Sequence, residues 1–360
     1  MLSTIVALDV GASSLKAVES NNPFSRHPTA IRAGLVELDE GTIVNGDVAD
    51  EFALAHSIKE LWRIAGFKSN RVVVSFDGQK SILRPMTLPL LPLDLLRESL
   101  PLNAAGDLPM PAENYVLDFV PIAKSKDRGN VDGFLVAMDV NTANSLSTAL
   151  MKANLSVLRI DSAAFAIART FQPFYDGSPT AIVSIGSRTT NVVIVNGHGV
   201  AQFIRIIPEG GHNVTKCLMD TMNIDHKSAL ELKKSIGLMG IERDDDMTDM
   251  EYARLSHASE LIRSQTKSII LRIRNSIQYY MESDDGIKVE KIIVTGGVAG
   301  MKGMVESVSM ATGIESDQSF MKSRMNSVKL NIHDEAQSKL VMDRYDGFTT
   351  AFGLLLGPRP

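Results

Sequence analysis

The stretch Leu8-Asp9-Val10-Gly11-Ala12-Ser13-Ser14-Leu15-Lys16 decides the fold of this chain. It ends an apolar strand in a carboxylate, turns through glycine and small hydroxyl residues, and continues into a strand that carries a lysine. Backbone amides in such a turn can cradle phosphate, and a carboxylate at the strand end can hold the water molecules of a magnesium ion. The candidate phosphate-binding residues are Asp9, Gly11, Ala12, Ser13, Ser14 and Lys16, with Asp9 also the water-mediated magnesium ligand. A plain β-hairpin turn without a ligand is the alternative.

A second stretch with the same layout follows about half a chain later. Val183-Ser184-Ile185-Gly186-Ser187-Arg188-Thr189-Thr190-Asn191 again joins two strands through glycine and hydroxyl residues. Two copies of one phosphate hairpin predict an internally duplicated fold with a cleft between its halves. The candidate residues of this second hairpin are Gly186, Ser187, Arg188 and Thr189.

A third glycine segment closes the pattern. The strand Ile292 to Val294 runs into Gly296 and Gly297, where a backbone without side chains would let a flat adenine or ribose lie close. A simple strand-to-helix turn is the alternative reading of this segment.

Composition excludes several classes of protein. Forty-two acidic and 37 basic residues give a net charge of -5, and no block of lysine or arginine provides the footprint of a nucleic-acid binder. One cysteine in 360 residues allows neither an internal disulfide nor a thiolate zinc site. No basic region precedes the first apolar run, and no run reaches the roughly 18 apolar residues of a membrane span. We therefore expect a cytoplasmic protein that meets a membrane only through its partners.

Periodicity indicates an α/β architecture. Helical patterns cover Leu54 to Ala65 and about Glu251 to Met281. Six of the 14 prolines fall between residues 85 and 111, which predicts an inserted subdomain rather than a central strand. The clearest strand patterns are Ile5 to Leu8, Val72 to Val74, Phe134 to Val136, Ala181 to Ile185, Val192 to Val195 and Ile292 to Val294.

The order and spacing of the three glycine segments resemble the actin-like ATPase superfamily. In that superfamily two hairpins grip the phosphates and the late double glycine lies under the nucleoside. The resemblance implies an actin-like duplicated fold, with two lobes around a nucleotide cleft that binds ATP with magnesium.

Further segments are similar to the PilM and FtsA branch of that superfamily. The run Phe203 to Gly211 matches a segment that both families share, Arg84 to Pro89 resembles the start of their extra 1C subdomain, and Phe348 to Leu354 resembles their last helix. Val116 to Phe119 and Ile160 to Ala166 favour the PilM family. The resemblance adds four candidate nucleotide-binding residues, namely Gly210, Gly211, Lys233 and Val298.

The resemblance also implies a division of the chain. Residues 1–81 would form the first lobe (1A), 82–157 the 1C-like insert, 158–179 the return to the first lobe, 180–335 the second lobe (2A and 2B) and 336–360 a terminal helix.

Four positions depart from the superfamily pattern. Ser184 stands where most relatives carry aspartate, and a neutral hydroxyl cannot order metal-bound water as a carboxylate does. Ala163 and Leu230 each stand where a glutamate is usual, and Val298 replaces a third glycine. These departures imply retained but weakened nucleotide binding with slow or absent hydrolysis, so that the protein is at most a slow ATPase. Complete loss of nucleotide binding is the alternative.

By resemblance, the expected function is that of a cytoplasmic adaptor in a type IV pilus or type II secretion-like assembly platform. A groove beside the insert would bind the short amino-terminal peptide of a PilN-like membrane protein, and other platform proteins could bind elsewhere. An FtsA-like cell-division protein is one alternative, although the sequence ends at Pro360 without that family's amphipathic membrane helix. A small-molecule kinase with Asp77 as its base is the other.

Overall fold

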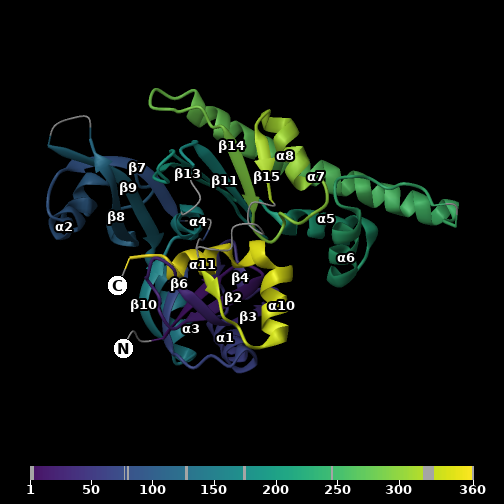
Figure 1. Ribbon diagram of the computed structural model, residues 1–360, viewed down its shortest axis with the longest axis horizontal. Helices are drawn as coiled ribbons and strands as arrows, with labels where there is room; N and C mark the ends of the chain where they lie inside the picture. The colour runs from purple at the N-terminus through teal and green to yellow at the C-terminus, as the bar shows by residue number, and fades with distance from the viewer. Residues whose placement is uncertain are drawn as a thin grey trace.

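Two β-sheets, one of six strands and one of five, form the framework of the protein, and five strands of the first repeat the arrangement of the second (Figure 1). The computed structural model describes residues 4–358 except 77, 79–80, 126–128, 173–175, 245 and 319–327. The first sheet has the order β10-β6-β1-β2-β3-β16 and the second has the order β13-β12-β11-β14-β15. The strands of the first sheet are β1 (Ile5–Val10), β2 (Ser14–Ser20), β3 (Thr29–Glu37), β6 (Arg71–Ser75), β10 (Ser156–Asp161) and β16 (Lys329–Leu330). The strands of the second sheet are β11 (Thr180–Ile185), β12 (Thr190–Val195), β13 (Ala201–Ile207), β14 (Lys291–Thr295) and β15 (Glu315–Asp317).

The two sheets repeat each other strand by strand. In the first, β1 pairs antiparallel with β2 and parallel with β6; in the second, β11 pairs antiparallel with β12 and parallel with β14. Next to the hairpin, each sheet adds one antiparallel strand, which is β3 in the first sheet and β13 in the second. On the opposite side, each sheet adds one parallel strand, which is β10 in the first sheet and β15 in the second. The predicted duplicated α/β fold is therefore confirmed.

Helices cover both sheets and fill the space between them. Outside the first sheet lie α1 (Glu51–Ala65) and α3 (Val140–Lys152). Between the two sheets lie α4 (Ala163–Phe171) and α11 (Thr349–Leu355), whose apolar residues join side chains from both sheets in one core (Figure 1). Outside the second sheet lie α5 (Gly211–Met222), α6 (His226–Ile236), α7 (Asp249–Met281) and α8 (Met304–Thr312).

The contact between α4 and α11 is close enough to require a glycine. A Cβ atom on Gly353 would lie 1.8 Å from the carbonyl oxygen of Ala166. Thr170 Oγ1 donates to the carbonyl of Thr349 at 2.7 Å, and Arg169 Nε donates to the carbonyl of Gly353 at 3.1 Å. This helix pair therefore fixes the distance between the two lobes.

The proline-rich region forms a separate small subdomain. Its three-stranded sheet has the order β7-β9-β8, and α2 (Leu93–Asn103) packs on it through an apolar cluster of its own. Pro85 and Pro89 lie on β7, an edge strand, where the missing N–H removes no inner ladder bond. The strands are β7 (Ile82–Pro89), β8 (Tyr115–Lys124) and β9 (Asn130–Asp139).

Three predicted boundaries differ from the observed elements. α3 packs against α1 and β10 pairs with β6, so the chain returns to the first lobe at Val140 rather than at residue 158. β16 pairs with β3 of the first lobe, which places residues 329–330 outside the second lobe. The segment expected as one terminal helix consists of α10 (Glu335–Asp343), a 3-10 turn (Tyr345–Phe348) and α11.

The long predicted helix is present and its apolar stripe is buried. α7 has 33 residues, and Ile262, Ile269 and Ile273 on it pack against the second sheet. Its arginines are exposed, and Arg272 forms an ion pair with Glu209. Of the helices that the structure describes, none combines the length and the apolar character that a bilayer crossing requires.

The close helix contact predicts the effect of one added methyl group. We expect Gly353→Ala to lower the free energy of unfolding by about 3 kcal/mol or more, because α4 and α11 must separate to accept it. Chemical denaturation measures this change. The matched control is Gly106→Ala, where an added Cβ meets nothing within 4 Å, and we expect it to change stability by less than about 0.5 kcal/mol. Equal stability of the two variants would contradict the proposed role of the contact.

Candidate functional site

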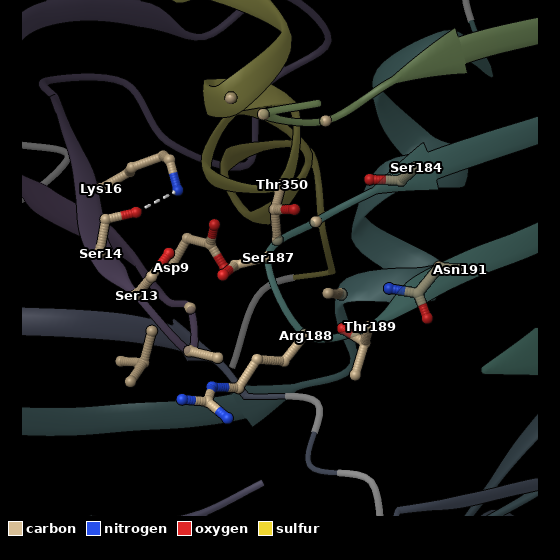
Figure 2. A pocket seen from close by; sticks show the side chains of 18 of the residues that line it. Asp9, Ser13, Ser14, Lys16, Ser184, Ser187, Arg188, Thr189, Asn191 and Thr350 are labelled. Atoms are coloured by element: carbon tan, nitrogen blue, oxygen red, sulfur yellow. Dashed lines mark hydrogen bonds between the residues drawn. The ribbon is translucent and has the colours of Figure 1, made fainter. Parts of the chain in front are cut away.

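A single cleft brings the two predicted hairpins together. Gly11 at the end of β1 and Gly186 at the end of β11 line the same cavity (Figure 2). The residues that face each other across it come from parts of the chain that lie far apart in sequence. Of the predicted site residues, those that line the cleft are Asp9, Gly11, Ala12, Ser13, Ser14, Lys16, Gly186, Ser187, Arg188, Thr189, Gly296 and Gly297.

The two hairpins share one turn geometry. The Gly11 amide donates to the carbonyl of Ser14 at 3.2 Å, and the Gly186 amide donates to the carbonyl of Thr189 at 2.9 Å. An added Cβ would lie 2.9 Å from the first carbonyl oxygen and 3.0 Å from the second, so both tight turns favour glycine.

The amides inside these turns are available to a ligand. Among the residues that the structure describes, no protein acceptor takes the backbone N–H of Ala12, Ser13, Ser187 or Arg188. Consecutive unused N–H groups in a tight turn form a concave donor surface that suits phosphate oxygens. The cleft therefore presents two such surfaces, one on each lobe.

The first lobe places a carboxylate and an ammonium group in the cleft. Ser75 Oγ donates to Asp9 Oδ1 at 2.8 Å, and Lys16 Nζ donates to Ser14 Oγ at 2.9 Å. Burial raises the pKa of Asp9, and the nearby Lys16 and the Ser75 hydroxyl oppose that shift. Burial likewise lowers the pKa of Lys16, which Asp9 opposes. Both groups are desolvated, and each opposes the pKa shift of the other, so the two charges offset one another within the first-lobe wall.

The second lobe places neutral groups at the equivalent positions. Asp9 pairs with Lys16 across the first hairpin, and Ser184 pairs with Asn191 across the second. Asn191 is 6% exposed, and its Oδ1 has no hydrogen-bond partner. Asn191 is not among the site residues predicted from the sequence, although alignment of the two hairpin stretches matches Asn191 to Lys16.

Other residues that line the cleft could not be identified from the sequence. Asp346 and Thr350 come from the segment around the last helix, Ile43 comes from the short strand β4 (Ile43–Val44), and Phe76 directly follows β6. Ala163, where a glutamate is usual in the resembled superfamily, also lines the cleft. Asp77, the candidate base of a kinase, lies outside the described residues.

Four predicted nucleotide-binding residues do not line the cleft. Lys233 is 9% exposed, and its Nζ donates to the carbonyl of Gly211 at 3.0 Å and to Thr215 Oγ1 at 2.8 Å. This lysine therefore holds the first turn of α5 against α6. Val298 packs beside Gly211, where an added Cβ would lie 2.6 Å from Val298 Cγ2. Gly210 lies against the second hairpin, where an added Cβ would lie 2.5 Å from the carbonyl oxygen of Ser187. Contact of these four residues with a nucleoside stays a prediction.

The donor set of the cleft fits a phosphate chain better than a metal ion held by protein alone. Two amide surfaces, Lys16 and Arg188 supply donors and positive charge. No group of three histidine, cysteine or acidic side chains gathers as metal ligands anywhere in the part of the chain that the structure describes. A magnesium ion would therefore need ligand oxygens and water in addition to Asp9.

Comparisons with known proteins agree with this geometry. The family described as "Type IV pilus assembly protein PilM" matches residues 7–357. The solved structure titled "PilM-PilN type IV pilus biogenesis complex" aligns with a TM-score of 0.81 at 22% identity, covering 99% of this chain and 100% of that one. MreB 5 of Spiroplasma citri, solved with bound AMPPNP, aligns with a TM-score of 0.51 at 12% identity, covering 98% and 95%. The cell division protein FtsA of Bacillus subtilis (strain 168) is 20% identical over 343 residues, which is 83% of this chain and 74% of that protein.

The buried lysine predicts a distinct pH dependence of stability. Burial, helped by Lys234, lowers the pKa of Lys233 from 10.5 to about 8. Between these two values the unfolded chain binds more protons than the folded one, so this group makes the protein more stable as pH rises from about 8 to 10.5. Relative to Lys233→Met, the wild type should gain up to roughly 3 kcal/mol across that window, as followed by urea denaturation.

The control for this experiment is Lys267→Met, which removes an exposed lysine from α7. Its stability should follow that of the wild type at every pH. If the curves of wild type and Lys233→Met run parallel between pH 7.5 and 10.5, the lysine is not desolvated as described.

Proposed function

The chain belongs to the type IV pilus assembly protein PilM family, and from this premise we propose that it is a cytoplasmic adaptor of a pilus or secretion-like assembly platform. In this proposal it docks the amino-terminal cytoplasmic peptide of a PilN-like inner-membrane protein. Nucleotide in the cleft stabilises the arrangement of the lobes and is turned over slowly or not at all.

The observation that carries the proposal is the extent of the family match. It spans residues 7–357 and so includes both lobes and the insert. The structure named as a PilM–PilN complex shares this architecture over 99% of the chain, which supports a partner of the same kind. The weaker similarity to FtsA is compatible with a shared fold and does not favour a role in division.

The junction between insert and first lobe offers a place for a peptide. A small polar pocket lies where β9 ends and α3 begins, lined by Asp47, Asp139, Asn141 and Thr142 among others. Asp139 Oδ1 already accepts from the amides of Asn141 and Thr142, and Asp47 Oδ1 accepts from Thr142 Oγ1. The second oxygen of the Asp139 carboxylate can accept from an amine or backbone N–H of a bound peptide.

The insert also exposes an unusual number of large apolar side chains. They lie on the β7–α2 connection, on α2 and around the start of β8, and Leu102 is 84% exposed. Exposed apolar residues gathered on one small unit are typical of an interaction surface. The members of this apolar surface are Leu90, Leu91, Leu93, Leu95, Leu102, Met110 and Val116.

A synthetic peptide tests the adaptor role. We expect a fluorescent peptide with the first cytoplasmic residues of the PilN-like protein from the same genome to bind the full chain, as measured by anisotropy. Leu91→Arg should weaken binding by about tenfold, which corresponds to roughly 1.4 kcal/mol. No binding by the wild type would overturn the adaptor proposal.

A matched variant separates docking from general damage. Leu271→Arg changes an exposed leucine of similar accessibility on α7 of the second lobe, and it should bind the peptide like the wild type. Equal loss in Leu271→Arg and Leu91→Arg would show that the insert is not the docking place.

A further inference from the structure

The second-lobe wall of the cleft differs in charge from the first-lobe wall. At equivalent strand positions, the first lobe carries Asp9 and Lys16 and the second carries Ser184 and Asn191. Both pairs line the same cavity. The two hairpins therefore share their backbone structure, but only the first has an acidic residue, Asp9, at the position that Ser184 occupies in the second.

The polar side chains of the second wall are unengaged. Figure 2 shows the Ser184 hydroxyl and the Asn191 amide nitrogen turned toward the cleft. Neither group donates a hydrogen bond to any residue that the structure describes, and Asn191 Oδ1 is buried without a partner. Asn191 is only 6% exposed, and its amide nitrogen, which faces the cleft, can donate to a phosphate oxygen there, whereas its Oδ1 is an acceptor that a phosphate cannot satisfy.

Positive charge and further donors line the same cleft as these two side chains. Arg188 lines the cleft from the hairpin itself, and the amides of Ser187 and Arg188 are unused within the described chain. The set comprises a guanidinium group, a hydroxyl, a primary amide and backbone N–H groups. Such a set matches phosphate oxygens, which accept hydrogen bonds from all of them.

Because position 184 carries a serine rather than a carboxylate, protein groups at this wall can contact a phosphate directly. A carboxylate at position 184 would repel a phosphate group and would need a cation between them. The Ser184 hydroxyl and the Asn191 amide can donate to the phosphate directly. Their neutrality removes the requirement for an intervening metal ion on this side of the cleft.

We propose that the second-lobe wall binds the terminal phosphate of a nucleotide directly through Ser184 and Asn191, so that binding does not depend on a divalent cation. This proposal rests on the nucleotide role of the cleft proposed above and specifies the chemistry of that site. Its consequence is that cleft occupancy follows the concentration of nucleotide rather than that of free magnesium.

Calorimetric titration with ADP, ATP and inorganic pyrophosphate, each in magnesium and in EDTA, tests the proposal. For the wild type we expect at least one of these ligands to bind with dissociation constants that agree within about threefold in the two buffers, because the phosphate contact needs no cation. Wild-type binding that disappears in EDTA and returns with magnesium would overturn the proposal.

Two variants probe the named side chains. Asn191→Leu should weaken binding in EDTA by about tenfold or more, as expected for hydrogen bonds lost to a charged group. Ser184→Asp should abolish binding in EDTA and restore it in magnesium, because the new carboxylate needs a bridging cation. Unchanged affinity in Asn191→Leu, or Ser184→Asp that binds equally in both buffers, would contradict the direct contact.

Controls keep these outcomes apart from misfolding and from failure of the adaptor role. Asn275→Leu and Ser264→Asp make the same chemical changes on the exposed face of α7 and should bind like the wild type. The thermal midpoint of each variant without ligand reports its folding. Absence of binding by all three ligands in both buffers would refute this inference, whereas the peptide experiment would still decide the adaptor proposal independently.

Discussion

The crossing of α4 and α11 is the constraint on which the site depends. Gly353 allows the two helices to approach until its Cα faces the carbonyl of Ala166, and apolar residues from both sheets pack around them. Each sheet contributes one hairpin to the cleft, so the separation of the hairpins is set by the thickness of this helix layer. A change in the layer would move all the phosphate-facing amides of one lobe relative to those of the other.

The two halves have kept their backbone and diverged in charge. Strand order, strand direction and the glycine turn are the same in both sheets. The first lobe retains a desolvated carboxylate and ammonium group, whereas the second offers neutral donors and Arg188. An asymmetric pair of walls is suited to holding an anion in one orientation. It is less suited to activating water, because only one of the two equivalent strand ends supplies a carboxylate.

Much of the fold could be predicted because it depends on local pattern. The strand, glycine-turn, strand layout around Gly11 and Gly186 specifies a hairpin from its own residues, and its repetition indicates the duplication. The predicted residues that failed to reach the cleft, such as Lys233, came from resemblance, and the side chain is drawn instead toward Gly211 and Thr215. Asp346 could not have been found, because its place in the cleft depends on packing across the whole chain. Segment boundaries failed for the same reason, since β10 and β16 are defined by partners distant in sequence.

The way the insert is attached has an evolutionary consequence. The strand that leads into it, β7, and the strand that leads out of it, β9, lie side by side, with Ile82 paired to Ala137. Its apolar cluster draws only on its own residues. The insert is also anchored on the core between the lobes, where Phe134 of β9 packs edge-on against Phe165 of α4 with ring centroids 5.7 Å apart. Substitutions on its outer surface can therefore change what it binds while the two-lobed scaffold beneath it keeps its structure.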